Sequence, residues 1–179
     1  MDISKRLPGW KDLTQVYGII VLVIYSWTIL SFLWMFPSWR NILTAGEILA
    51  VLAFSLASAF AESLVVLCVP ALVGLVLPRT WFGNLFVARG AALALSGLAY
   101  VMFLDRQLQS QSGFPELGLP GWVLLAPLAV IVLLVYLPGR IKLLRKFLES
   151  LADRATIFLY IMVPVSAISV LAALAGLTP

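Results

Sequence analysis

Long apolar runs alternate with short polar stretches along the whole chain. Most of the runs hold roughly 18–25 predominantly apolar residues, the length at which an α-helix crosses the hydrocarbon core of a bilayer, and the second is longer than an untilted crossing needs. The pattern predicts an all-α fold, a polytopic membrane helix bundle that forms a single integral membrane domain over residues 1–179. The five predicted transmembrane helices cover residues of about 16–36, 48–77, 86–104, 121–138 and 155–176.

A different periodicity lies between the fourth and fifth of these segments. In residues 139–153, apolar side chains recur at three- and four-residue spacing, and basic residues take many of the remaining positions. This pattern is typical of an amphipathic helix that lies in the headgroup region of a membrane. We expect Arg140, Lys142, Arg145 and Lys146 to contact anionic lipid headgroups at the cytoplasmic face, with a cytoplasmic protein partner as the alternative.

Composition supports membrane insertion and narrows the range of functions. Of the 179 residues, 63% are hydrophobic and 11% are charged, which is too few charges to cover the surface of a soluble domain. The chain has no histidine and one cysteine, so we expect neither a metal site nor a cofactor. The net charge of +4 comes from basic residues scattered between apolar segments, a placement that indicates orientation in the bilayer rather than nucleic-acid binding.

The basic residues of the connections predict how the chain crosses the membrane. Ten lysines and arginines lie before the first segment, around the link between the second and third, and between the fourth and fifth. The other connections carry only Arg40 and Arg106. By the positive-inside rule, this asymmetry predicts a cytoplasmic N-terminus and an outside C-terminus. The basic inner loops fit a multi-pass protein of a bacterial plasma membrane.

One carboxylate, Glu62, interrupts the second apolar segment. At 100° per residue, Ser55, Ser58 and Glu62 share one face of that helix, while alanines gather on a largely different face. We expect both faces to meet other helices, which would place this helix at the centre of the bundle. A charge there costs about 2.5–3.5 kcal/mol, so we expect a protonated Glu62 that is hydrogen-bonded to Ser55, Ser58, Ser63 or a helix carbonyl. Arg89 is too far along the bundle to pair with it, and we expect that side chain to extend to the cytoplasmic interface.

Two classes of function fit these observations. The first is a non-catalytic membrane protein that acts as an anchor, scaffold or accessory subunit of a complex with another membrane protein or with copies of itself. The alternative is a small proton- or ion-coupled transporter in which Glu62, Ser58 and Ser55 bind the substrate or the proton. The sequence has no histidine base, no G-x-S-x-G motif and no pair of carboxylates within one segment, so we expect no enzyme.

The predicted topology is similar to that of one group of membrane enzymes. Five spans with the N-terminus inside and the C-terminus outside resemble the membrane portion of lipoteichoic-acid synthases and phosphoethanolamine transferases. In those families an outer sulfatase-like domain follows the fifth span, whereas this chain ends at Pro179. The resemblance rests on topology and on no sequence motif. From it, we expect this chain to have a separate partner on the outer side of the membrane.

Overall fold

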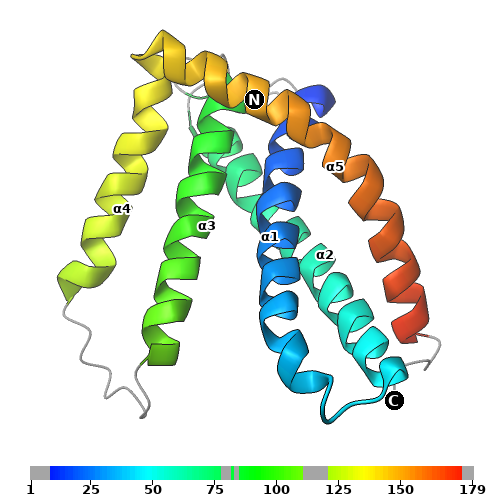
Figure 1. Ribbon diagram of the computed structural model, residues 1–179. Helices are drawn as coiled ribbons and strands as arrows, with labels where there is room; N and C mark the ends of the chain where they lie inside the picture. The colour runs from blue at the N-terminus through cyan, green and yellow to red at the C-terminus, as the bar shows by residue number, and fades with distance from the viewer. Residues whose placement is uncertain (1–8, 78–81, 83–84, 111–120, 175–179) are drawn as a thin grey trace.

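The computed structural model describes residues 9–77, 82, 85–110 and 121–174, and the regular structure in these ranges is entirely helical. Figure 1 shows that most of the helices run side by side as a bundle. The all-α fold predicted from the apolar pattern is therefore confirmed for the described residues. The helices are α1 (Trp10–Trp39), α2 (Ala45–Val76), α3 (Phe86–Ser110), α4 (Gly121–Tyr136), the 3₁₀-helix η3 (Leu137–Gly139) and α5 (Lys142–Leu174).

Four stretches of helix in the described residues are long and apolar enough to cross a membrane, which indicates a membrane protein. The fourth predicted segment corresponds to α4, which is apolar but only 16 residues long. A helix of that length measures about 24 Å, less than the roughly 30 Å of a bilayer core. The four candidate spans are Trp10–Trp39, Ala45–Val76, Phe86–Arg106 and Lys142–Leu171.

A capping box starts α2 directly after the short connection from α1. The Thr44 backbone N–H donates to Glu47 Oε2 at 2.7 Å, and the Glu47 backbone N–H donates to Thr44 Oγ1 at 3.4 Å. These two bonds satisfy donors that the first turn of a helix leaves unpaired. The carboxylate also lies at the positive end of the helix dipole. The α1–α2 hairpin thus has a defined tip at Arg40–Thr44.

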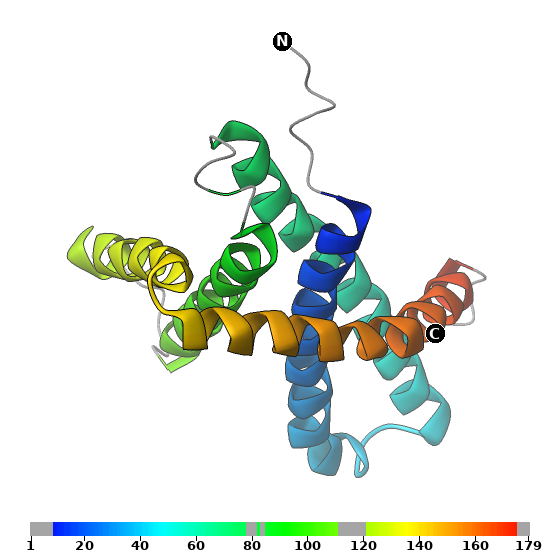
Figure 2. The ribbon, with the colours of Figure 1, turned by 90° about the horizontal axis from the view of Figure 1, so that it is seen from above.

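The centre of the bundle is α1, which packs against α2, α3 and α5 (Figures 1 and 2). The expectation that the second segment occupies the centre is wrong, because α2 packs against α1 and α5 and makes little contact with α3. Small side chains on α2 permit close packing but do not require it, and Ala61 is exposed. The α1 residues buried in the larger core cluster are Val16, Ile20, Val21, Ile24 and Tyr25.

At Gly18, α1 and α5 lie in close backbone contact. A Cβ atom at this position would lie 2.9 Å from the backbone nitrogen of Thr156 and 3.0 Å from the carbonyl carbon of Ala155. Real Cβ atoms do not tolerate such distances to backbone atoms, so the absence of a side chain allows the two helices to touch. About two turns further along α1, the Tyr25 hydroxyl is hydrogen-bonded to the Ser166 hydroxyl, which joins the same two helices through polar groups.

The predicted amphipathic helix and the fifth predicted span form one continuous helix, α5. Its first half lies across one end of the bundle, and its second half descends beside α1 and α2 (Figures 1 and 2). Neither glycine nor proline occurs in residues 142–163, so nothing ends the helix where the sequence changes from amphipathic to apolar. On the buried side of the first half, Leu148, Ala152 and Ala155 pack with Ile19 of α1 and with alanines of α3.

Most of the basic residues that the structure describes lie at the end of the bundle that α5 crosses, which we call the basic end. The start of α1, the start of α3 and the end of α4 all lie there (Figure 1). Lys11 is the second residue of α1, Arg89 is in the first turns of α3, and Arg140 directly follows η3. The opposite end holds the α1–α2 hairpin with Arg40.

Candidate functional site

Glu62 lines an open groove of about 380 Å³ between α1 and α2, which we call the α1–α2 groove. The groove runs from the last turn of α1, at Trp39, to Trp27 and Glu62 near the middle of their helices. Its lining combines aromatic and polar side chains. The polar ones are Thr28 and Ser31 of α1 and Ser55, Ser58 and Glu62 of α2.

Helix periodicity explains why these polar groups meet. Thr28 and Ser31 are three residues apart on α1, and Ser55, Ser58 and Glu62 follow at three- and four-residue spacing on α2. Each set therefore forms a stripe along one side of its helix. The antiparallel packing of α1 and α2 turns the two stripes toward the same groove.

The hydrogen bonds show which of the predicted serines contacts Glu62 and which bond elsewhere. Ser58 Oγ donates to Glu62 Oε1 at 3.2 Å. Ser55 lines the same groove, but its hydroxyl donates to the carbonyl oxygen of Val51 at 2.8 Å. Ser63 is buried outside the groove, where its hydroxyl donates to the carbonyl oxygen of Phe60 and lies 3.1 Å from the Tyr17 hydroxyl. Of the serines considered as partners of Glu62, Ser58 is the one that the structure brings to it.

Glu62 is exposed on the surface of the chain, and so is its partner Ser58. Its place near the middle of the 32-residue α2 puts it far from either end of an apolar helix. A carboxyl group at this depth needs a protonated state, water or a partner group, because the acyl chains of lipids offer no hydrogen bonds. One hydroxyl at 3.2 Å satisfies only part of its hydrogen-bonding capacity.

On the side of Glu62 that faces the basic end, α1 and α2 are in direct contact. There the Tyr17–Ser63 hydrogen bond joins α1 to α2, and the side chains around Val16 and Ile20 form the core. The residues that line the groove therefore lie between the middle of the bundle and the hairpin end. Aromatic rings line that part of it, and the centroids of Phe32 and Trp39 are 5.5 Å apart.

Sequence reasoning missed the contact between Trp27 and Arg106. The guanidinium carbon of Arg106 lies 5.8 Å from the centroid of the Trp27 ring, which is a cation–π geometry. Trp27 lines the α1–α2 groove, so this contact brings the charge of α3 next to it. The sequence signals were a tryptophan in the middle of an apolar segment and an arginine at the end of another, but pairing them required the fold.

The four residues predicted to contact lipid headgroups are all exposed at the basic end. Arg140 donates from Nε and Nη2 to the Tyr136 hydroxyl at 3.0 and 2.8 Å. Arg145 forms an ion pair with Glu149 at 2.8 Å, one turn away on the exposed side of α5. Such exposed pairs add little stability. Lys142 and Lys146 add two more positive charges to the same surface.

Metal binding has no support in the described residues, which contain no group of three or more potential ligand side chains. Comparison with protein-family models, with curated proteins and with solved structures finds no match for this chain. Its function therefore has to be argued from the geometry of the groove and of the basic end.

Proposed function

We propose that this chain is a non-catalytic membrane protein that acts as an anchor, scaffold or accessory subunit of a membrane complex. In this proposal the α1–α2 groove receives a helix of another membrane protein or of a second copy of the chain. The observation that carries the proposal is the exposure of Glu62 and Ser58 within a polar groove in the middle of apolar helices. A neighbouring helix with a hydrogen-bond donor would cover both groups and complete their bonding.

The proposed placement in the membrane has the basic end in the cytoplasm of a bacterial plasma membrane and the α1–α2 hairpin outside. The gathering of basic residues at the end crossed by α5 supports this orientation. We further propose that α4, extended by η3, makes a fifth crossing, and that the first half of α5 lies in the cytoplasmic headgroup layer. There Arg140, Lys142, Arg145 and Lys146 would face anionic lipid.

Proton- or ion-coupled transport is the second candidate. It is favoured by the groove that links Glu62 with the hairpin end, because such a path could hydrate the carboxyl group from one side. Ser58 and Ser55 would then be its neighbours in a binding site. Transport also requires access from the other side, where the Tyr17–Ser63 bond joins the helices in this conformation.

The variant Glu62→Gln separates the two functions. Glutamine keeps the size and the hydrogen-bonding capacity of a protonated glutamate but cannot release a proton. For a scaffold, we expect the variant to assemble with its partner as the wild type does, as measured by co-purification from membranes. A matched variant, Glu62→Leu, removes the hydrogen bonds and should weaken the association about tenfold, the effect of roughly 1.4 kcal/mol.

The outcome that contradicts the scaffold proposal is equally specific. If Glu62→Gln folds and assembles normally but abolishes a proton or ion flux that wild-type proteoliposomes show, the carboxyl group is a transport site.

A further inference from the structure

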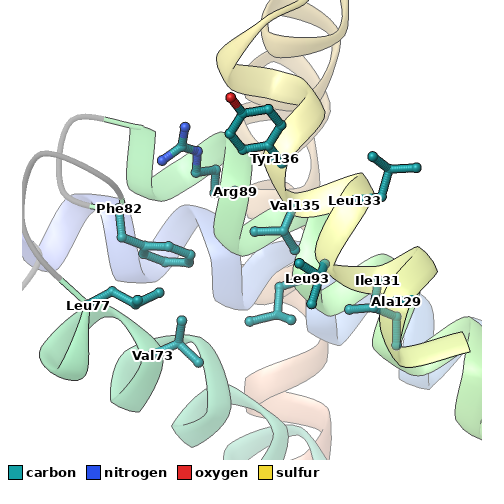
Figure 3. Close-up of a pocket in the computed structure, with 11 residues that line it drawn as sticks. Val73, Leu77, Phe82, Arg89, Leu93, Ala129, Ile131, Leu133, Val135 and Tyr136 are labelled. Atoms are coloured by element: carbon teal, nitrogen blue, oxygen red, sulfur yellow. The ribbon is translucent and has the colours of Figure 1, made fainter. Parts of the chain in front are cut away.

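An apolar cavity of about 580 Å³ lies between α2, α3 and α4 near the basic end (Figure 3). Leu77 of α2, Leu93 of α3 and Val135 of α4 are among the residues of its walls. All the other lining residues are hydrocarbon as well, except for Arg89 and Tyr136. The volume falls within the roughly 300–1,000 Å³ of typical small-molecule sites.

The cavity exists because α4 stands away from the rest of the bundle. Its main partner is α3, whereas α2 and α4 make little contact with each other (Figure 1). The space between α2 and α4 is therefore filled by neither helix. A molecule that enters this space from the bilayer would pass between apolar helices, so its own surface would have to be hydrocarbon.

The two polar lining residues lie together at one end of the cavity (Figure 3). Arg89 is in the first turns of α3 and Tyr136 is the last residue of α4, so both lie toward the basic end. Leu93 and Ala129 lie deeper, about one to two turns further along the same helices. The cavity is thus cationic at one end and apolar in its interior. A phospholipid has the complementary arrangement, with an anionic phosphate at one end and acyl chains at the other.

The guanidinium group of Arg89 carries an unsatisfied hydrogen-bond donor. Its Nε atom is buried and has no hydrogen-bond partner among the described residues. The guanidinium group lies over Gly139, where an added Cβ would come within 2.5 Å of Nη2. Arg140, the next residue, holds the Tyr136 hydroxyl with two hydrogen bonds. A second guanidinium group is thus fixed beside the same end of the cavity, and the local charge is positive.

We propose that this cavity binds one acyl chain of an anionic membrane phospholipid, whose phosphate pairs with the Arg89 guanidinium group. Arg89 lines the cavity, so its guanidinium group is placed to pair with the phosphate of a lipid held there. Guanidinium–phosphate pairs are strong because both partners are charged. This site holds a single lipid with its chain inside the protein. It differs in that respect from the headgroup contacts of α5, and it does not depend on the α1–α2 groove.

Native mass spectrometry of the full chain, released from detergent micelles, tests the proposal. We expect one phosphatidylglycerol molecule to stay bound, and phosphatidylcholine with the same acyl chains to bind about tenfold more weakly because its headgroup carries no net charge. Arg89→Gln should lower retention of phosphatidylglycerol about tenfold for the same reason. The matched control is Arg40→Gln, which removes an exposed arginine charge from the hairpin at the opposite end of the bundle and should retain the lipid.

A second variant tests the hydrocarbon part of the site. Leu93→Trp fills the cavity without changing its charge, and we expect it also to release the lipid. Inorganic phosphate at the same concentration should not shift the thermal unfolding of the wild type, because it lacks the chain. The proposal is overturned if the two lipids are retained equally, if Arg89→Gln and Leu93→Trp both keep the bound lipid, or if phosphate alone stabilises the protein as the lipid does.

Discussion

Ser58→Trp is expected to release this protein from its membrane partner while the chain itself stays folded. Ser58 is exposed and lies on the wall of the α1–α2 groove, so an indole ring at this position fills the space that a partner helix would occupy. It also removes the hydroxyl that donates to Glu62. Residues at the centre of an interface carry most of its binding energy, and we expect complex formation to fall at least about tenfold.

Site-specific photo-crosslinking in native membranes measures this effect. A photo-reactive amino acid in place of Ser31, which faces the groove from α1, should form a discrete protein adduct that disappears in the Ser58→Trp background. The mass of the adduct distinguishes a second copy of the 19.6-kDa chain from a different protein.

The control for this experiment comes from the same helix. Val65 of α2 is 69% exposed and lies outside the groove, so Val65→Trp should leave the adduct unchanged. An adduct that survives Ser58→Trp, or a crosslinker at Ser31 that labels only lipid, would show that no helix occupies the groove.

Gly18→Ala should cause the largest loss of stability among single-methyl changes in the described helices. The new Cβ would meet backbone atoms of Ala155 and Thr156 at 2.9–3.1 Å, and backbone atoms cannot rotate away as a side chain can. Overpacking of this kind costs about 1–3 kcal/mol. For a chain of this length we expect a decrease in melting temperature of roughly 2–4 °C per kcal/mol, measured by thermal unfolding of the detergent-purified protein.

The same substitution at Gly97 is the matched control. Gly97 is also inside a helix, but a Cβ there would find no atom within 4 Å. Because alanine is favoured over glycine in helices by about 0.5–1 kcal/mol, Gly97→Ala should be neutral or slightly stabilising. Equal effects of the two substitutions would contradict the close contact between α1 and α5.

Elements that depend on local sequence could be predicted, and those that depend on contacts between helices could not. Long apolar runs are sufficient to identify membrane helices, since the bilayer sets their length. The central position of α1 depends instead on how large side chains such as Ile20 and Tyr25 pack among three neighbours. The change in polarity near residue 154 predicts two separate helices, whereas α5 is continuous, because polarity alone does not end a helix.

The candidate site follows the same division. Ser58 and Glu62 are four residues apart on one helix, and their hydrogen bond could be predicted from that spacing. The Tyr17–Ser63 bond and the contact between Trp27 and Arg106 join residues on different helices. Sequence spacing within one helix therefore does not predict them. Cys68 illustrates the same limit, because it lies within an apolar segment and is nevertheless exposed. In a membrane, apolar neighbours do not distinguish a core position from one that faces lipid.

The continuity of α5 has a consequence for the order in which this protein is assembled. Ribosomes make the chain from its N-terminus, so α1 and α3 enter the membrane before α5 has been synthesised. Until then, Ile19, Ala88 and Ala91 lack the cover that Leu148 and Ala152 later provide. Of the described helices, α5 is made after the others and covers the basic end. A nascent chain interrupted before Lys142 would leave that surface available to chaperones and proteases.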